Sequence, residues 1–262
     1  MTAEHRAIVD SYATAHSLEF VPFAEKPIYQ GTPFHYGKPL GVSNVFRATS
    51  GRPMEFGNFS YSWPLQGDDA LKYVWDFAYL AIKLDRRLPQ ISLQSKGSPV
   101  LWDISGSPVG PDLSQLLTLE GDFNRYFYFY CPKDYETDAL YVFTPDVMAL
   151  FIDEAAPFDA EIIDDWLFIY SRYPFGAGDT ATYDRLLRIV QVVGAKVVHQ
   201  TDLYRDDRVG NFAANVVSQP GQRLARRIPW QVPAIIAAVV VGPFVLFGIL
   251  SLVVSVLVGG LL

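Results

Sequence analysis

The last 31 residues of the chain, 232–262, contain no Asp, Glu, Lys or Arg and are predominantly apolar. About 20 apolar residues cross roughly 30 Å of hydrocarbon as a helix, so this run is long enough for one span and too short for two. A buried core helix is the alternative, but a helix this long that is apolar on every side is typical of a membrane span. We therefore expect one C-terminal transmembrane helix at 232–262.

The residues in front of this run predict how the chain is oriented. Arg223, Arg226 and Arg227 precede the span, and no charged side chain follows it. Because basic flanks stay in the cytoplasm, residues 1–231 are expected there, in a single-pass protein of the cell membrane. Trp230 stands where an aromatic ring favours the membrane interface. We expect these four residues to lie at the surface of the lipid bilayer.

The rest of the chain is acidic. Residues 1–222 hold all 28 acidic residues and all but three of the 21 basic ones, which argues against nucleic acid as a partner. The single cysteine, Cys131, excludes a disulfide framework and a multi-cysteine metal site. Since the chain has only four scattered histidines as well, we expect no metal site and no cofactor.

Residue patterns over 1–199 predict an α+β domain, with an antiparallel meander sheet and a few packed helices. Thr2 is a candidate N-cap for a helix at 2–16, and Asp179 or Thr180 for a helix that ends near His199. A shorter helix is expected to begin at Thr144-Pro145. Strands are expected at 41–49, 55–63, 69–84, 90–94, 116–130, 139–143, 161–163 and 166–170.

The other segments are expected to be irregular. Residues 20–40 are rich in Pro and Gly and are expected to be extended, and 96–113 to form a loop. Residues 200–231 show no apolar period and are expected to form a linker and a basic juxtamembrane segment. The predicted organisation is therefore a cytoplasmic domain at 1–199, a linker at 200–231 and a membrane anchor at 232–262.

No catalytic residue can be nominated from its spacing. Cys131 follows an aromatic strand and is expected to be structural, and His35, between Phe34 and Tyr36, is expected to be a packing residue. Six carboxylates between Asp153 and Asp165 could bind a divalent cation, but they lack EF-hand spacing. A solvated acidic face is the favoured interpretation of that stretch.

Small residues recur at every fourth position of the predicted span. They form two stripes, Ala234, Ala238 and Gly242, and Ser251, Ser255 and Gly259. Small residues at this spacing let a second membrane helix approach closely, although Gly, Ala and Ser are also common in spans that face lipid. We expect these six residues to contact other integral membrane subunits.

Two motifs in the middle of the chain carry a family resemblance. Leu119–Asn124, an acidic-Phe-Asn segment before the aromatic run at 126–130, is followed by Asp138–Leu140 and by Thr144–Met148. This order resembles a bacterial, actinobacterial family of uncharacterised membrane-anchored domains over roughly residues 40–200, and the resemblance brings no assigned activity. In its size and tail anchor, the chain is also similar to accessory subunits of the actinobacterial respiratory supercomplex, which joins a cytochrome bc complex to an aa3-type oxidase.

These patterns favour a non-catalytic accessory or assembly subunit of a larger bacterial membrane complex. Its tail helix would hold the subunit, and its acidic domain would lie in the cytoplasm. The alternative is a membrane-tethered enzyme or small-ligand sensor. A deep pocket that contains His35, Cys131 or the acidic stretch at 153–165 would favour that alternative.

Overall fold

The computed structural model describes residues 2–65, 68–97, 99–101, 110–119, 121–210 and 215–227. The chain divides into unit 1, residues 1–105 and 111–225, and unit 2, residues 106–110 and 226–262. The predicted span at 232–262 lies outside the described residues. Among the helices that are described, none has the length and apolar character needed to cross a membrane.

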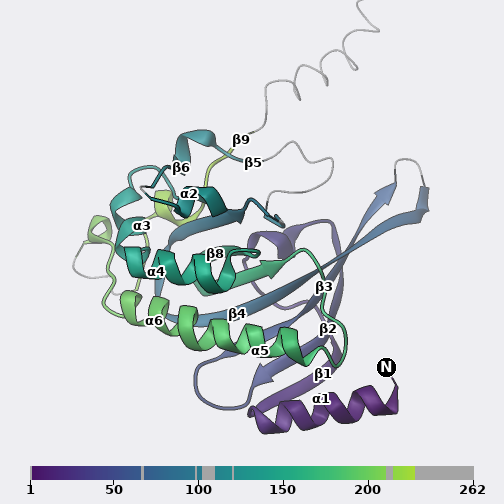
Figure 1. The fold of residues 1–262 in the computed structure, drawn as a ribbon. Helices are drawn as coiled ribbons and strands as arrows, with labels where there is room; N and C mark the ends of the chain where they lie inside the picture. Colours follow the sequence, from purple (N-terminus) through teal and green to yellow (C-terminus); the bar gives the residue numbers. More distant parts are fainter. Residues whose placement is uncertain are drawn as a thin grey trace, which may run out of the picture. The chain divides into compact units, whose positions relative to one another are not determined.

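Unit 1 is built on one antiparallel sheet with several packed helices, which confirms the predicted α+β class (Figure 1). The hydrogen-bonded order is β1-β2-β3-β4-β7-β6, and β8 also pairs with β4. The strands are β1 (Leu18–Ala24), β2 (Lys38–Ala48), β3 (Met54–Leu65), β4 (Asp68–Ser95), β6 (Leu116–Leu117), β7 (Phe127–Tyr130) and β8 (Asp159–Ser171). Strands β5 (Gly110–Pro111) and β9 (Arg226–Arg227) form a separate two-stranded sheet.

The predicted first and last helices of the domain are confirmed. Thr2 caps α1 by accepting a hydrogen bond from the His5 N–H, and Asp179 caps α5 by accepting one from the Thr182 N–H. The α-helices are α1 (Ala3–Ala15), α2 (Phe123–Tyr126), α3 (Glu136–Val142), α4 (Pro145–Leu150), α5 (Thr180–Ile189), α6 (Ala195–Thr201) and α7 (Gln219–Gln222). Shorter turns are the 3₁₀ turns η1 (Thr32–His35), η2 (Leu113–Gln115) and η5 (Asp207–Val209), and the π-helical turns η3 (Phe151–Ala155) and η4 (Val190–Gly194).

Strand β4 is the centre of the sheet. Its first half pairs with β3, its second half pairs with β7, and β8 runs beside both halves. The strands predicted at 69–84 and 90–94 are therefore one strand with a register shift between Lys83 and Leu88. The strands predicted at 161–163 and 166–170 are likewise one strand, β8, within which Asp164 takes a left-handed φ of 54°.

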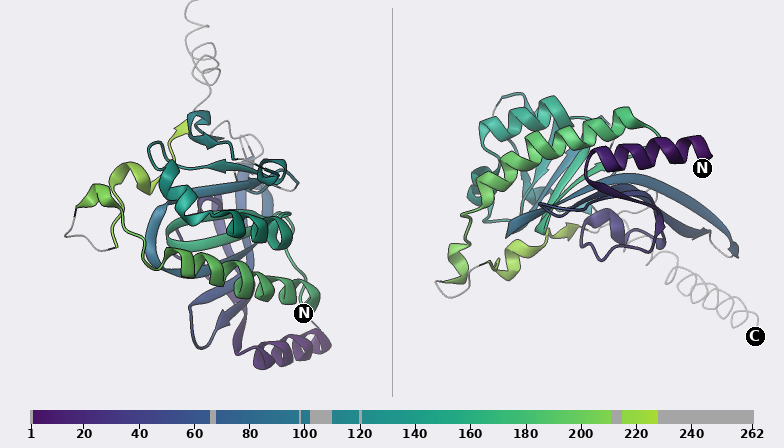
Figure 2. Two further views of the ribbon diagram at one scale, coloured as in Figure 1. Left: turned by 60° about the vertical axis from the view of Figure 1, so that its left-hand side comes forward. Right: turned by 90° about the horizontal axis from the view of Figure 1, so that it is seen from below.

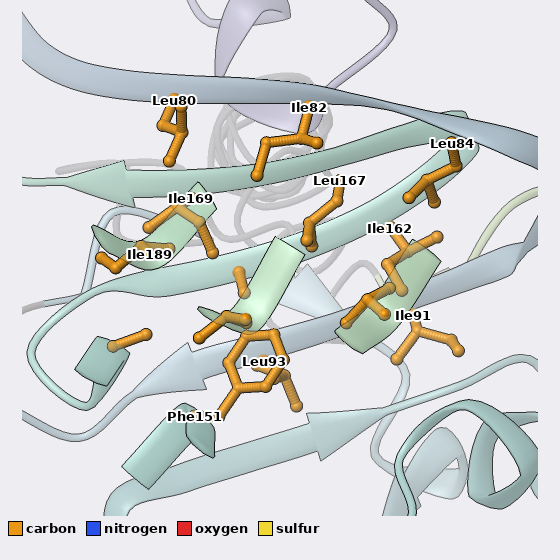
Figure 3. Close-up of a cluster of buried hydrophobic side chains, with 14 of the residues drawn as sticks. Leu80, Ile82, Leu84, Ile91, Leu93, Phe151, Ile162, Leu167, Ile169 and Ile189 are labelled. Carbon is orange, nitrogen blue, oxygen red and sulfur yellow. The ribbon is translucent and has the colours of Figure 1, made fainter. Parts of the chain in front are cut away.

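The two faces of the sheet are covered differently (Figure 2). Helices α1 and α5, with the helical segments that follow α5, pack on one face over a core of aliphatic and aromatic side chains that includes Leu80, Ile162 and Ile189 (Figure 3). The other face carries an aromatic core. There, Phe34 of η1 is fully buried and makes edge-on ring contacts with Phe59, Phe77, Tyr79 and Phe168.

Three predicted segments are wrong in instructive ways. Residues 116–130 contain only the short strands β6 and β7, with α2 between them, and residues 139–143 lie at α3 rather than in a strand. The described part of 200–225 is no linker, because it belongs to unit 1 and buries Tyr204, Val217 and Leu224. Those three apolar residues are too widely spaced to form the regular apolar pattern of a helix or a strand, although each one is buried in the domain.

Candidate functional site

A cleft of about 780 Å³ lies between α3 and the segment that follows α6. Two of its apolar side chains reach solvent: Leu203 is 76% exposed, and Tyr141 is about half as exposed. The cleft is lined by Thr137, Asp138, Tyr141, Leu203, Tyr204, Arg205, Asp207 and Arg208. Exposed apolar groups beside fixed charges are the ingredients of a binding surface.

Tyr135, the residue just before α3, connects the chain segments beside the cleft. Its ring is buried, and its hydroxyl donates to Asp206 Oδ2 at 2.7 Å and also contacts the Ser218 hydroxyl. Gly221 of α7 packs directly on this ring, where an added Cβ would come within 2.4 Å of Tyr135. The segments 134–138, 203–208 and 215–221 are thereby joined at one ring.

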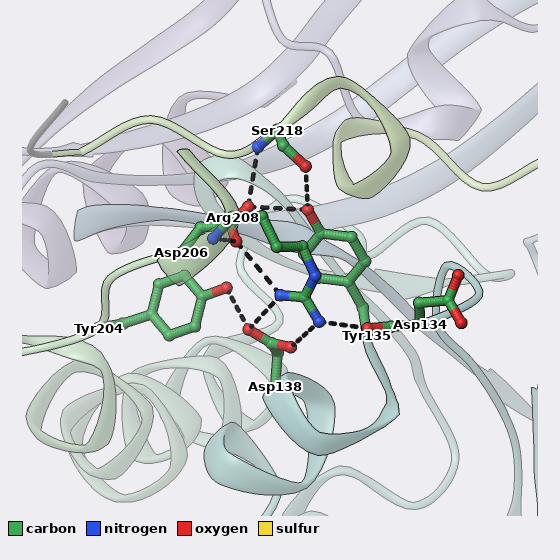
Figure 4. A network of polar contacts seen from close by, with 7 residues as sticks. All are labelled: Asp134, Tyr135, Asp138, Tyr204, Asp206, Arg208 and Ser218. Carbon is green, nitrogen blue, oxygen red and sulfur yellow. Dashed lines mark hydrogen bonds and ion pairs between the residues drawn. The ribbon is translucent and has the colours of Figure 1, made fainter. Parts of the chain in front are cut away.

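Arg208 is the centre of the polar network beside the cleft (Figure 4). Its guanidinium lies 3.9 Å from the centroid of the Tyr135 ring and donates to Asp138 Oδ2 at 3.1 Å and to Asp206 Oδ1 at 3.2 Å. It also donates to the Asp134 carbonyl. Tyr204 donates to Asp138 Oδ1 at 2.7 Å. The cation is thus held by two carboxylates and an aromatic face, a geometry suited to a planar guanidinium.

The electrostatics of the network fix its protonation states. Burial and the hydrogen bond to Asp138 raise the pKa of Tyr204, so its hydroxyl remains a donor. Burial alone would raise the pKa of Asp206, but hydrogen bonds from the Ser218 N–H, Tyr135 and Arg208 lower it overall. Burial opposes the charge of Arg208, yet Asp138 and Asp206 raise its pKa. Asp206 and Arg208 therefore both keep their charges at neutral pH.

A second polar cluster lies inside the aromatic core, around Glu161 of β8. This fully buried carboxylate accepts hydrogen bonds from the Thr32 N–H at 2.7 Å, the Thr32 hydroxyl at 2.6 Å, Gln90 Nε2 at 2.7 Å and the Tyr170 hydroxyl at 3.1 Å. Gln90 Oε1 in turn accepts from the Leu224 N–H at 2.7 Å. Burial raises the pKa of Glu161. The cluster ties η1 and the end of unit 1 to the sheet.

The acidic stretch at 153–165 is not the solvated face that the sequence predicts. Asp159 and Glu161 are buried, and Asp159 accepts hydrogen bonds from the backbone N–H groups of Ser95, Val100 and Leu101. The remaining pairs are Glu154 with Arg188, Asp164 with Arg223, and Asp165 with Lys83. Within the described residues, no group of three or more His, Cys, Asp or Glu side chains could hold a metal ion.

Cys131 and His35 lie apart from both polar clusters. Cys131 is buried, and burial raises the pKa of its thiol to about 12, so the thiol is not an activated nucleophile. His35 is exposed at the end of η1. Neither residue lines the cleft beside Arg208.

The residues predicted to lie at the membrane surface fall on both sides of the boundary between the units. Arg223 belongs to unit 1 and forms a two-pronged ion pair with Asp164, at 3.0 and 3.2 Å. Arg226 and Arg227 form β9. Trp230 and the six small residues of the tail stripes lie outside the described residues.

The residues of the cleft were not found from the sequence. Asp138 and Arg208 are 70 positions apart, and the second carboxylate, Asp206, stands in a segment that the sequence predicts to be a linker. Tyr204 and Arg208 lie close together in a polar stretch of the sequence. That stretch has no residue pattern that would identify a binding site.

No family model matches the chain, and no curated protein matches it. Among solved structures, it is similar to the crystal structure of the mycobacterial trehalose monomycolate transport factor A, TtfA. The two share 13% sequence identity with a TM-score of 0.49, over 75% of this chain and 96% of that chain. A similarity of this degree establishes neither a shared family nor a shared function.

Proposed function

We propose that this chain is a non-catalytic accessory subunit of a bacterial membrane complex. In this proposal, residues 232–262 anchor the chain, and the cleft beside Arg208 docks a segment of an integral membrane subunit on the cytoplasmic side. The observation that carries the proposal is the juxtaposition of exposed Leu203 and Tyr141 with a cation network whose charges are already paired.

Because the charges beside the cleft are already paired, they support a role in protein docking rather than in catalysis. Asp138, Asp206 and the hydroxyls of Tyr135 and Tyr204 are all engaged with one another or with Arg208. A general base or nucleophile needs a lone pair or proton that is available to substrate. A rigid polar wall next to apolar side chains instead resembles the centre and rim of a protein interface, where aromatic and apolar anchors dominate the affinity.

Site-specific cross-linking tests this proposal in the full chain. A photoreactive amino acid at Leu203 should form an adduct with an integral membrane protein in cells, whereas the same group at Phe23 should not. Phe23 is a suitable control because it is apolar, 81% exposed and carried by β1, outside the cleft. Leu203→Glu should reduce co-purification of the cross-linked protein about tenfold, as expected for loss of an apolar anchor. Equal adducts at both positions would refute the docking site.

The finer hypothesis is that the complex is respiratory. It rests on the similarity in size and anchoring to accessory subunits of the actinobacterial supercomplex. Purification in mild detergent with an N-terminal tag should then recover stoichiometric haem-containing partners, visible in a reduced-minus-oxidised absorbance spectrum. Recovery of a partner without haem would reject the respiratory assignment and leave the accessory role in place.

A small-ligand sensor is the second candidate, and the volume of the cleft favours it. About 780 Å³ lies within the range of pockets that hold small molecules. Native mass spectrometry of the purified chain distinguishes the two roles. A bound small molecule that Leu203→Glu removes, together with no cross-linked protein, would support the sensor.

A further inference from the structure

Strand β4 has an open edge next to the point where β8 ends. The pairing of β8 with β4 stops at Ser171 and Ala78, while β3 stays paired with β4 beyond that point (Figure 1). From Tyr73 to Phe77, β4 is therefore paired with β3 on one side, and no described strand lies along its other side. Backbone N–H and C=O groups on such an edge can pair with another extended chain.

Aromatic side chains of β4 become exposed along this edge. Phe77, Trp75 and Tyr73 alternate along the strand and so share one face of the sheet. Their exposed fractions rise from 3% at Phe77 to 38% at Trp75 and 58% at Tyr73. Tyr170 of β8 still packs on Phe77, with 5.9 Å between the ring centroids, and β8 ends one residue later. The aromatic core of the sheet thus continues into solvent where the neighbouring strand stops.

A hollow of about 220 Å³ lies at the same place. Most of its lining is aromatic or aliphatic, and includes Tyr61, Trp75, Phe77, Val100 and Tyr173. Phe77 and Val100 are buried, whereas Tyr173 is largely exposed. The hollow is much smaller than the cleft of the candidate site and shares no lining residue with it. A volume of this order holds one large apolar side chain rather than a whole ligand of drug size.

The charge at the hollow favours a basic partner. Asp76 lines the hollow and is exposed, and its carboxylate accepts a hydrogen bond from the Ser60 hydroxyl, but no cation among the described residues pairs with it. Arg172 also lines the hollow and is already engaged, in part by the Pro99 carbonyl at 3.5 Å. Residues 1–222 hold all 28 acidic residues of the chain but only 18 of the 21 basic ones. A lysine or arginine of a partner would therefore be attracted to this end of β4.

We infer that the open edge of β4 at Tyr73–Phe77 binds an extended segment of a partner protein. The segment adds a strand to the sheet where β8 ends, and one of its large apolar side chains enters the hollow. A basic residue beside that side chain faces Asp76. The occupant is thereby defined by three features of unit 1: an unpaired strand edge, a hollow of side-chain size and an exposed carboxylate. The site is separate from the cleft of the proposed function, and each can be tested without the other.

Selection from a random peptide library tests this site in the full chain. Peptides displayed on phage are selected against the detergent-solubilised protein, and their affinities for the purified full chain are then measured by fluorescence anisotropy. We expect the selected peptides to share a large apolar residue next to a lysine or arginine. Failure to select any peptide would overturn the site.

Two variants with matched controls locate the bound peptide. Tyr173→Ser removes one wall of the hollow and should weaken binding about tenfold, whereas Tyr126→Ser, which removes an exposed ring from α2, should not. Asp76→Lys should weaken binding about threefold or more, whereas Glu25→Lys, the same charge change on an exposed residue just after β1, should not. Equal affinities for Tyr173→Ser and Tyr126→Ser would overturn the site. Equal affinities for Asp76→Lys and Glu25→Lys would overturn the basic partner.

Backbone methylation of the selected peptide distinguishes strand addition from other modes of docking. In a strand paired at one edge, alternate N–H groups point toward the neighbouring strand. Methylating every second peptide nitrogen should therefore abolish binding in one set of positions and spare it in the other set. Equal effects of the two sets would overturn strand pairing at β4.

Discussion

Glu161→Gln should reveal how much one buried carboxylate contributes to the fold. The substitution keeps the shape of the side chain but replaces one acceptor oxygen with an N–H₂ donor. The backbone N–H of Thr32 cannot reverse its role, so the new amide oxygen must stay at the position of Oε2, 2.7 Å from that nitrogen. The new N–H₂ group then faces the Thr32 hydroxyl, which can rotate to accept, and Gln90 Nε2, which cannot.

The conflict therefore falls on Gln90. If Gln90 keeps its orientation, one buried donor loses its acceptor. If Gln90 flips, the Leu224 N–H loses its own acceptor instead. Either outcome leaves one buried donor unpaired, which costs about 1–3 kcal/mol. For a domain of this size, that is a fall in melting temperature of roughly 2–12 °C.

Thermal and urea unfolding of the full chain in detergent measure the effect. Glu154→Gln is the matched control, because Glu154 makes an ion pair with the exposed Arg188 and should change stability by less than about 1 kcal/mol. The exchange Gln90→Glu/Glu161→Gln restores a donor opposite an acceptor and should recover part of the loss. If Glu161→Gln unfolds at the same midpoint as Glu154→Gln, this account of the buried cluster is wrong.

Three further predictions follow from other contacts. The lowered pKa of Asp206 means that its stabilising contribution is complete above the ordinary value of 3.8 and is lost as pH falls through the folded pKa. Asp206→Asn should therefore lower stability by about 1–3 kcal/mol at pH 7 and by less at pH 3, measured by urea midpoints; an equal loss at both would contradict the sign. Gly31→Ala should destabilise by about 1–3 kcal/mol in thermal melts, since its Cβ would lie 2.2 Å from the Tyr170 hydroxyl, whereas Gly176→Ala has open space. Chelator should leave the melting temperature unchanged, because Glu154, Asp159, Glu161, Asp164 and Asp165 are paired with protein donors; a large fall would reveal a structural metal ion.

Local signals decided which elements the sequence could predict. Helix α1 and the α5-to-α6 segment carry caps at Thr2 and Asp179 that act within their own first turns, so no distant contact was needed to recognise them. The strands predicted at 41–49 and 55–63 are confirmed as the antiparallel pair β2 and β3. Such features depend on residues three or four positions apart.

The errors in the predicted elements arise where an apolar run is too short to show whether its period is that of a helix or of a strand. Residues 139–143 fit a strand or a helical turn equally well. In α3, the acidic residues Glu136 and Asp138 lie in the first turn, and Asp138 is further fixed by Tyr204 and Arg208, far along the chain. The same distant contacts build the cleft, which is why neither α3 nor the candidate site was predictable from its neighbours in sequence.

Composition is the poorest guide to structure where charged side chains are buried. An acidic stretch is expected to be solvated, because an unpaired buried carboxylate is costly. Asp159 avoids that cost because it accepts hydrogen bonds from three backbone N–H groups. Glu161 avoids it because it accepts four hydrogen bonds, from donors in η1, β4 and β8. The donors come from segments up to 129 residues away, so a sequence pattern around position 161 cannot reveal them.

The segment before the predicted anchor changes what the domain can do at a membrane. A polar linker from 200 to 231 would let the domain rotate and move away from the bilayer. In unit 1, however, Arg223, Leu224 and Ala225 are held by Asp164, Gln90 and Gln115, so the chain is fixed to the domain as far as Ala225. Under the proposed accessory role, a chain that is fixed this close to the predicted anchor would restrict how unit 1 could meet a membrane-embedded partner. The glutamine contacts at Ala225 are therefore as relevant to the proposed accessory role as the cleft itself.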